Sequence, residues 1–175
     1  MICKKYKIKY IKNGFQIGGL TPYLYFSDEK LLNIQNNFLT KFIIDISIKQ
    51  NIKPNESTIV DLGCGHGDTS LSLSFYFNKV YGFDISQEML EVAENNKKKL
   101  SLLLRENFSS NNIIFDIGSF NDKLKIDKPV EIILLKNTIH FANPGTIGTI
   151  IENLLEHIVI NGLIIIYEPS EDAKF

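Results

Sequence analysis

The residues with the clearest chemical meaning lie in the stretch TIVDLGCGHGDT, Thr58–Thr69. An apolar run there ends in an acid, Asp61, and three glycines follow at alternate positions, Gly63, Gly65 and Gly67. Glycine lets the backbone turn sharply and approach a ligand without a Cβ in the way. The pattern therefore predicts a loop that lies against a bound ligand.

Two classes of ligand are bound by loops of this kind. Dinucleotide enzymes use the spacing G-x-G-x-x-G, which places a pyrophosphate on a helix N-terminus. Here the spacing is G-x-G-x-G, and the carboxylate of Asp61, two residues before the first glycine, would repel a pyrophosphate. It suits instead a ligand with a cationic amino group and a sulfonium, and S-adenosylmethionine is such a ligand.

The composition limits the class of protein. A chain of 175 residues fits a single domain, residues 1–175, because domains usually hold about 100 to 200 residues. The net charge of −1 gives no field that would attract nucleic acid or an anionic membrane. No run looks like a signal peptide, or approaches the ~20 apolar residues of a membrane span. Cys3 and Cys64 are far apart, and no Cys/His spacing suits zinc. We expect a soluble, reduced, cytoplasmic protein with no metal.

Apolar strands alternate with helices along most of the chain. The expected strands are Thr58–Leu62, Lys79–Ile85, Asn112–Gly118, Val130–Lys136 and Leu163–Glu168. The expected helices between them are Asp68–Phe77, Gln87–Arg105 and Gly145–Ile160. This alternation implies right-handed crossovers and a parallel sheet covered on both faces. The predicted fold is α/β, a Rossmann-like doubly wound sheet of about five parallel strands in the order 3-2-1-4-5.

Two further elements are expected ahead of this sheet. Residues Lys5–Ile17 alternate in polarity around Asn13-Gly14, which predicts a β-hairpin with a type I′ turn. Ser27, followed by two acids, predicts the start of a helix that runs to about Gln50. The single domain then has three parts, a basic hairpin extension (1–20), a leading segment with its helix (21–57) and a cofactor-binding core (58–175).

The glycine stretch, read from Val60 to Gly67, resembles the first motif of the class I S-adenosylmethionine-dependent methyltransferases. The end of the second strand, GFDIS, resembles their next motif, about 20 residues further on. The resemblance implies that Asp84 holds the two ribose hydroxyls and that Ile85 lies on the adenine. Asp61, the three glycines and Cys64 are expected at the cofactor as well, Cys64 as a small loop residue and not as a nucleophile.

A finer resemblance covers about residues 21–169. The segment YLYFSDEK, Tyr23–Lys30, is similar to the Y-L-x-F-x-x-E-R segment of trans-aconitate methyltransferase-like proteins. In that group the segment helps to close the cofactor and substrate site, so Tyr23 is expected at the cofactor. The alternative is a loop ahead of a helix, in which the aromatic side chains simply pack.

Two positions depart from the family pattern. After the third strand the family usually carries an acid that meets the adenine amino group, and Ser119 falls at that place. A hydroxyl still accepts a hydrogen bond, and the backbone N–H of Phe120 is within reach of the adenine ring. We therefore expect weakened cofactor contact at this point, but not its loss.

At the end of the fourth strand, Lys136 falls where the family often has a small polar residue beside the reacting methyl. A lysine there would repel the sulfonium unless an acidic group neutralises it. Lys136 either binds a substrate carboxylate or points to solvent. His140 matches a His or Gln position of these proteins and is a candidate general base, with a packed structural histidine as the alternative.

The chain ends at Phe175, where the family continues with two more strands and a region that covers the substrate. The run Leu163–Tyr167 is then expected to be an edge strand, unusually apolar for exposure. The N-terminal hairpin is expected to cover this edge, or else a second subunit does, as a homodimer or a partner protein. Lysines of the hairpin fit an edge strand better than an RNA-contacting patch.

These features favour an S-adenosylmethionine-dependent methyltransferase acting on a small molecule, with a carboxylate as one type of acceptor. Methyl transfer from a sulfonium needs alignment and the exclusion of water, and neither a catalytic triad nor a metal. No D/N-P-P-Y/F motif follows the fourth strand, which disfavours methylation of DNA bases. One alternative is a catalytically incomplete cofactor-binding partner subunit. Another is a nicotinamide dehydrogenase, against which the glycine spacing and Asp61 argue.

Overall fold

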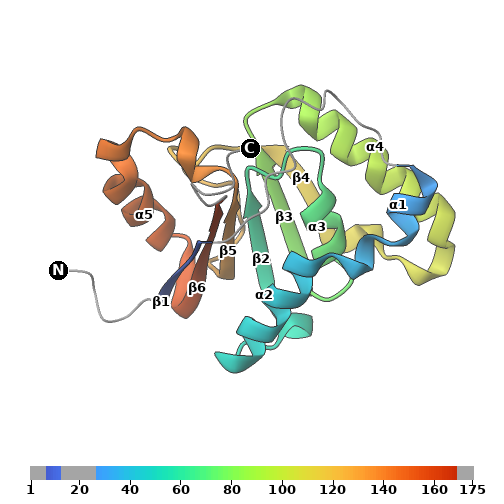
Figure 1. The fold of residues 1–175 in the computed structure, drawn as a ribbon, viewed down its shortest axis with the longest axis horizontal. Coiled ribbons are helices and arrows are strands. Elements are labelled where there is room, and N and C mark those ends of the chain that lie inside the picture. Colours follow the sequence, from blue (N-terminus) through green and yellow to red (C-terminus); the bar gives the residue numbers. More distant parts are fainter. Residues whose placement is uncertain (1–6, 13–26, 169–175) are drawn as a thin grey trace.

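The computed structural model describes residues 7–12 and 27–168, and these form a six-stranded sheet flanked by helices (Figure 1). The strands are β1 (Lys7–Lys12), β2 (Thr58–Leu62), β3 (Lys79–Asp84), β4 (Ile113–Ile117), β5 (Val130–Lys136) and β6 (Ile158–Glu168). They lie in the order β1-β6-β5-β2-β3-β4, and every neighbouring pair is parallel. The five strands from β2 to β6 have the order 3-2-1-4-5, so the predicted fold is confirmed.

The sixth strand, β1, covers the outer edge of β6. Its register runs from Lys7 opposite Leu163 to Lys12 opposite Glu168. The chain's own N-terminal segment therefore occupies the edge that was expected to need cover, and the second subunit is not needed there. The turn and second arm of the predicted hairpin lie outside the described residues, as does Tyr23.

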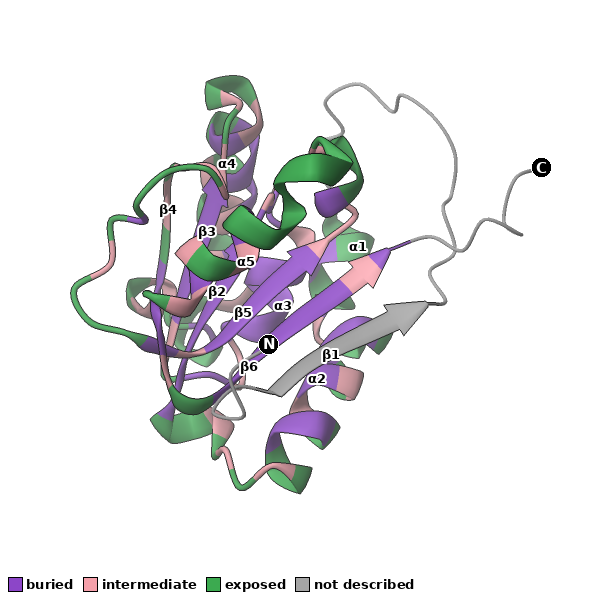
Figure 2. Cartoon of the chain, turned by 90° about the vertical axis from the view of Figure 1, so that its left-hand side faces the viewer, coloured by how far each residue is buried: buried purple, intermediate pink, exposed green. Residues whose placement is uncertain are grey.

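Helices cover both faces of the sheet. They are α1 (Asp28–Leu32), α2 (Phe38–Lys49), α3 (Asp68–Leu73), α4 (Gln87–Leu104) and α5 (Ile147–Leu155). On one face, side chains of α1 to α4 pack with one set of strand residues, among them Ile59, Val80 and Ile132. On the other face, α5 and the loops after β4 and β5 pack against the alternate set, such as Val60 and Ile133. Figure 2 shows the result, with buried residues concentrated in the central strands and in the sides of the helices that face them.

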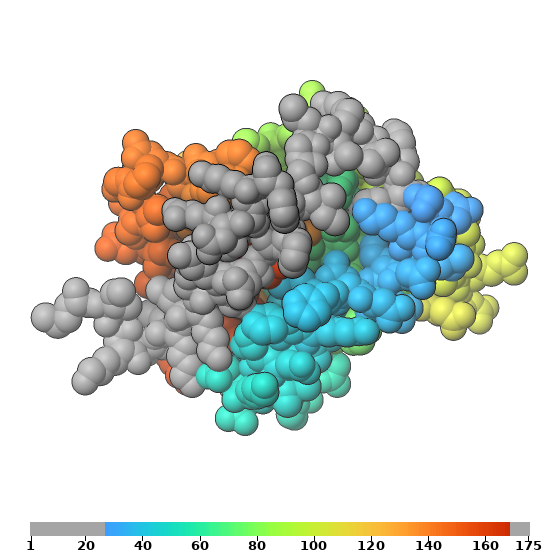
Figure 3. Space-filling model, viewed as in Figure 1, coloured from blue at the N-terminus to red at the C-terminus, as the bar shows by residue number. Residues whose placement is uncertain are grey.

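The predicted helix from Ser27 to Gln50 is wrong in one respect, because it is broken into α1 and α2. Ser27 caps α1, where its hydroxyl accepts from the N–H of Lys30 at 3.2 Å. Asn37 starts α2 in the same way, since its side chain accepts from the N–H of Leu39 at 2.9 Å. Asparagine competes with the helical backbone for hydrogen bonds and so favours a cap over a helix interior. In the space-filling view these two helices, blue to cyan, form a large part of the near surface (Figure 3).

Two other boundaries were also predicted wrongly. The helix expected over Asp68–Phe77 ends at Leu73 and continues only as turns. The helix expected over Gly145–Ile160 ends at Leu155, and β6 already begins at Ile158. The apolar residues after the helix belong to a strand that faces the same core cluster, so hydrophobicity alone did not separate the two elements.

No helix in the described part of the chain combines the length and the apolar character that crossing a membrane requires.

Candidate functional site

A cleft of about 400 Å³ opens at the carboxyl ends of the central strands. It is walled by the end of β2 (Leu62, Gly63), the end of β3 (Asp84, Ile85), the loop after β4 (Gly118, Ser119, Phe120, Asn121) and the turn after β5 (Asn137, Thr138, Phe141). This is the place where doubly wound sheets bind ligands, because the direction of the strand order reverses between β2 and β5. The cleft brings together five of the predicted cofactor residues, namely Gly63, Asp84, Ile85, Ser119 and Phe120.

The glycine loop turns sharply at the floor of this cleft. Its three glycines have φ angles of +83°, +52° and +82°, the left-handed region that other residues rarely adopt. At Gly63 there is also no room for a side chain, because a Cβ would lie 2.2 Å from the hydroxyl oxygen of Thr138. The loop is held to β3, where the carbonyl of Phe83 accepts from the N–H of Gly63 at 2.7 Å. The bare backbone predicted from the sequence is thus needed for packing at Gly63.

Asp84 ties the glycine loop to the following helix. One carboxylate oxygen accepts from the N–H of Gly65 at 2.8 Å, and the other accepts from the N–H of Ser86 at 2.9 Å. A carboxylate has about four lone-pair sites, so both oxygens keep accepting capacity toward the cleft. The next residue, Ile85, leaves 78% of its surface exposed, although a large apolar side chain is usually covered.

Asp61 lies beneath the glycine loop and is only 1% exposed. One of its oxygens accepts from the hydroxyl of Ser70 at 2.6 Å, whereas Oδ1 has no hydrogen-bond partner among the described residues. Burial raises the pKa of Asp61 to about 6, against the opposing effects of Ser70 and of Lys136. A buried oxygen without a donor is costly and calls for an explanation, such as a ligand that donates to it.

Lys136 does not point to solvent, which was one of the two alternatives expected for it. Its ammonium lies 3.1 Å from each carboxylate oxygen of Asp68 and 2.9 Å from the hydroxyl oxygen of Thr69. Burial alone would lower the pKa of Lys136, but the charges of Asp68 and Asp61 outweigh it and raise the pKa above its ordinary value. The neutralising acid that the family position required is therefore Asp68, which sequence reasoning did not single out.

The remaining predicted cofactor residues differ in what their side chains do. The hydroxyl oxygen of Ser119 accepts from the N–H of Asn121 at 3.0 Å and so helps to shape the loop. Cys64 is buried, with its sulfur facing the backbone of Gly82 rather than the cleft. Burial, reinforced by the charge of Asp61, holds the pKa of the Cys64 thiol well above its usual range. A raised pKa makes the thiol a poor nucleophile, and the role of Cys64 as a small loop residue stays a prediction.

His140 lies at the end of the turn after β5 and is bound to an acid that the sequence analysis missed. Its Nδ1 lies 2.6 Å from Oε2 of Glu168, the last residue of β6. Glu168 is only 5% exposed, while the His140 side chain is 39% exposed. The available signal was an acid directly after the apolar run of a strand, where parallel strands place their polar residues at the sheet's carboxyl edge.

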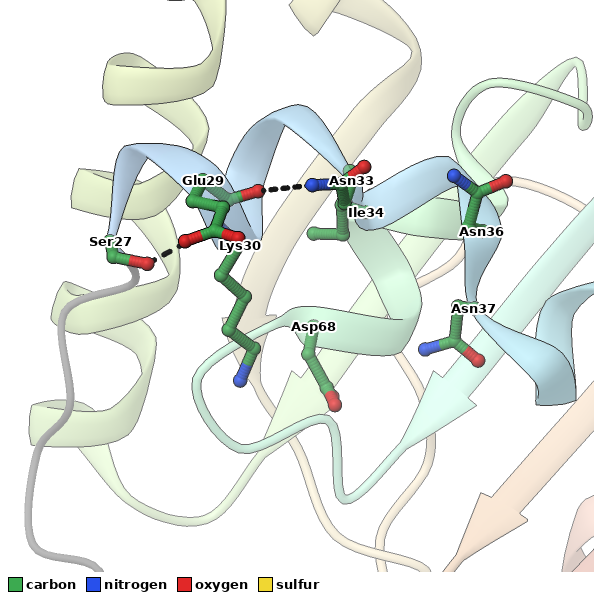
Figure 4. A pocket seen from close by; sticks show the side chains of 8 residues that line it. All are labelled: Ser27, Glu29, Lys30, Asn33, Ile34, Asn36, Asn37 and Asp68. Carbon is green, nitrogen blue, oxygen red and sulfur yellow. Dashed lines mark hydrogen bonds between the residues drawn. The ribbon is translucent and has the colours of Figure 1, made fainter.

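A second, more open cavity of about 460 Å³ lies between α1 and the start of α3. Figure 4 shows Lys30 and Asp68 facing this space, with Asn33, Asn36 and Asn37 along its wall. Asp68 lines this cavity, and its partner Lys136 precedes a residue that lines the cleft. The ion pair therefore connects the wall of this cavity with the end of β5, next to the turn that lines the cleft.

Comparison with known proteins agrees with this architecture. Residues 53–174 match the model of a methyltransferase domain. A probable S-adenosyl-L-methionine-dependent methyltransferase of Haemophilus influenzae, TehB, is 28% identical over 117 residues, which are 66% of this chain and 37% of that protein. The chain thus spans little more than a third of the curated relative's length.

Solved structures share the fold. The TehB structure from Haemophilus influenzae has a TM-score of 0.56 at 23% identity and covers 78% of this chain and 44% of its own. An S-adenosylmethionine-dependent methyltransferase from Clostridium acetobutylicum has a TM-score of 0.59 at 19% identity, covering 79% and 56%. Magnesium protoporphyrin IX methyltransferase from Synechocystis, solved with S-adenosylhomocysteine, has a TM-score of 0.54 at 17% identity, covering 81% and 58%. The family-level resemblance seen in the sequence is confirmed, and TehB is among the curated relatives. With 122 of its residues matched, the chain belongs to the methyltransferase domain family.

Proposed function

We propose that this chain binds S-adenosylmethionine in the cleft and transfers its methyl group to a small-molecule acceptor. The observation that carries the proposal is Asp84, a carboxylate on the cleft wall that holds the glycine loop through one oxygen and the start of α4 through the other. Membership of the methyltransferase domain family and the names of the relatives support the same reaction.

The residues around the cleft fit this cofactor. Two ribose hydroxyls are donors, and the carboxylate of Asp84 has lone pairs left to accept from both. Ile85 and Phe120 offer apolar surface to an adenine ring, and Ser119 lies beside them. Asp61 does not line the cleft, but its Oδ1 is a buried acceptor without a donor, which suits the ammonium group of the amino-acid part. A volume of about 400 Å³ lies within the range of small-ligand sites.

When bound, S-adenosylmethionine supplies a methyl group on a positively charged sulfur, an activated leaving group. The chain then has to align the acceptor and keep water out. It also has to avoid repelling the sulfonium, and for that the ammonium of Lys136 is neutralised by Asp68. Asp61 adds a further negative charge when it is ionised, so the local field favours a cationic ligand.

The acceptor is proposed to be a small molecule rather than a nucleic acid, in keeping with the net charge of −1. A carboxylate acceptor was expected on the ground that Lys136 would bind it. Because that ammonium is held by Asp68 and Thr69, the carboxylate is no longer the favoured acceptor.

Thermal unfolding tests the proposal against the dehydrogenase alternative. At a hundredfold over its dissociation constant, a ligand stabilises the folded state by about 2.7 kcal/mol. For a domain of this size that corresponds to roughly 5 to 10 °C. We expect this shift with S-adenosylhomocysteine and none with NAD. A shift with NAD alone, or with neither compound, would contradict the proposal.

A further inference from the structure

We propose that Glu168 is a positioning residue that holds His140 as the base for a methyl acceptor bearing an O–H or S–H group. The inference rests on the proposed methyl transfer and adds to it the class of acceptor. It starts from a buried carboxylate that the cofactor site does not use.

Among the described residues, the polar partners of the Glu168 side chain all lie in the turn after β5. Its Oε1 accepts from the backbone N–H of Thr138 at 2.8 Å and from that of Ile139 at 2.9 Å. Its Oε2 lies 2.6 Å from Nδ1 of His140. Because Glu168 comes from β6 and the turn follows β5, one side chain fixes both the turn and the histidine that the turn carries.

This arrangement selects one tautomer of the imidazole. An ionised carboxylate only accepts hydrogen bonds, so Nδ1 must carry the hydrogen and the neutral ring keeps its lone pair on Nε2. No hydrogen-bond partner of Nε2 lies within the described part of the chain, and the side chain is 39% exposed. Among the described residues, the charged side chain that contacts the imidazole ring is that of Glu168.

His140 also lies next to the cleft. Its ring packs on that of Phe141 with the two centroids 4.1 Å apart, and Phe141 lines the cleft. Thr138, two residues earlier, lines the cleft too and touches the position of Gly63. His140 is thus a neighbour, in sequence and in packing, of a residue that lines the cleft in which the methyl group is proposed to lie.

A base beside the cleft would take the proton of an acceptor that carries an O–H or S–H group. The O–H or S–H bond of the acceptor breaks, and its proton goes to Nε2 of His140. The acceptor oxygen or sulfur forms a bond to the methyl carbon, and the carbon–sulfur bond breaks with its electron pair going to sulfur. The products are the methylated acceptor, S-adenosylhomocysteine and an imidazolium, which returns its proton to solvent. A carboxylate is already ionised near neutral pH and has no proton to give.

Glu168→Gln separates positioning from packing. The amide oxygen of glutamine is needed by the two backbone N–H donors of Thr138 and Ile139, so its NH₂ group faces Nδ1 of His140. Nδ1 must then accept, and the hydrogen moves to Nε2. The side chain keeps its shape, but Nε2 of the ring no longer offers a lone pair. Loss of the correct tautomer in this way has a precedent in catalytic triads.

The first test is the tautomer itself. Long-range proton–nitrogen NMR spectra of the ¹⁵N-labelled chain at about pH 8.5, where imidazole is neutral, report which ring nitrogen carries the hydrogen. The signals of His140 are assigned from their loss in His140→Gln. We expect hydrogen on Nδ1 in the parent chain and in Glu152→Gln, an exposed control on α5, and on Nε2 in Glu168→Gln. Hydrogen on Nε2 in the parent chain, or no change in Glu168→Gln, would overturn the role of Glu168.

The second test is the class of acceptor, followed as release of S-adenosylhomocysteine with catechol, dithiothreitol or benzoate. Turnover with catechol or dithiothreitol should fall about 100-fold or more in both His140→Gln and Glu168→Gln, and stay unchanged in Glu152→Gln. If benzoate is methylated, and its turnover is the same in the parent chain and in both variants, the inference is overturned. The absence of turnover with both protic acceptors in a chain that binds S-adenosylhomocysteine overturns it as well.

Calorimetric binding of S-adenosylhomocysteine in the same samples separates the two proposals. Both glutamine variants should keep the parent affinity, because neither substituted side chain belongs to the proposed cofactor contacts. If the parent chain binds no S-adenosylhomocysteine, the proposed function fails, and the tautomer result then stands only as a structural role for Glu168.

Discussion

Two buried carboxylates at the carboxyl edge of the sheet have opposite surroundings. Glu168 at the end of β6 meets three partners, two backbone N–H donors and Nδ1 of His140. Asp61 at β2 meets one donor, Ser70, and leaves Oδ1 without a partner. Burial raises the pKa of Asp61 to about 6. Both acids are buried at the same edge of the sheet, but they differ in how many of their carboxylate oxygens have a hydrogen-bond partner.

This difference separates a structural acid from a binding acid. A carboxylate whose hydrogen bonds are complete stabilises the fold and fixes its neighbours, whereas one with an unpaired oxygen costs stability until a ligand supplies a donor. Proteins accept such costs at functional sites. Substitutions at the two acids and at the contact between their surroundings test this contrast.

Removing the satisfied acid should be severe. Glu168→Ala leaves the N–H groups of Thr138 and Ile139 without an acceptor and frees the ring of His140. At about 1 to 3 kcal/mol for each of these two N–H groups, the free energy of unfolding should fall by roughly 2 to 6 kcal/mol. Urea unfolding measures this loss, with the exposed Glu152→Ala as the control within about 0.5 kcal/mol. A loss below about 1 kcal/mol would remove the contrast with Asp61.

The glycine loop after Asp61 and the turn held by Glu168 touch where Gly63 meets Thr138. A methyl group added at Gly63 should disturb both. Gly63→Ala places a Cβ 2.2 Å from the Thr138 hydroxyl oxygen in a left-handed backbone. We expect a loss of about 2 to 4 kcal/mol, combining backbone strain with overpacking. Gly65→Ala, whose Cβ would meet nothing within 4 Å, is the matched control and should lose only about 1 to 2 kcal/mol of strain. Equal effects in denaturant unfolding would mean that the contact is unimportant.

Replacing Asp61, the unsatisfied acid, should raise the free energy of unfolding instead of lowering it. The pKa of Asp61 is raised from 3.8 to about 6, so the folded chain holds a proton that the unfolded chain releases between these values. Stability is therefore lost as the pH rises from about 4 to 6, and above that range ionised Asp61 is a cost. Asp61→Asn should stabilise the chain by about 1 to 3 kcal/mol at pH 7.5 and by little at pH 4. A destabilised Asn variant at pH 7.5 would show that Asp61 supports the fold.

The same acid should make ligand affinity depend on pH. Below about pH 6 Asp61 is protonated in the free protein, and pairing with the ammonium of S-adenosylhomocysteine requires the proton to leave. The dissociation constant should then rise, approaching tenfold per pH unit, as the pH falls from 6 toward 5. Titrations between pH 5 and 8 measure the slope. Asp61→Asn should bind weakly with no such slope, and an unchanged slope would assign the proton to another group.

Much of the framework was readable from the sequence, because it depends on local patterns. The strand Val130–Lys136 was predicted with its observed bounds, since an apolar run buried on both faces has a clear signature. The loop glycines and Asp84 could be placed at one edge of the sheet, because the glycines follow one strand and Asp84 ends the next. The break between α1 and α2 was missed, although Asn37 is a good capping residue, because the apolar pattern continues across it.

The partners of these residues were not readable. Asp68 and Lys136 are 68 positions apart in the chain, and His140 and Glu168 are 28 apart. Which acid meets which base depends on β5 lying between β2 and β6, and on the direction that each side chain takes. The unpaired oxygen of Asp61 is likewise a property of packing around it. Local sequence reasoning gives the residue types at an edge, and only the packed structure gives their pairs.

The most direct test of the account is a calorimetric titration of S-adenosylhomocysteine into the whole chain at pH 7.5, repeated with Asp84→Asn and Asp45→Asn. Both variants lose one negative charge, but Asp84 lines the cleft and Asp45 is exposed on α2. We predict saturable binding in the parent chain and in Asp45→Asn, and at least about tenfold weaker binding in Asp84→Asn, since an amide cannot accept with both of its terminal atoms. No binding to the parent chain, or equal affinity in all three proteins, would contradict the assignment of this cleft as the cofactor site.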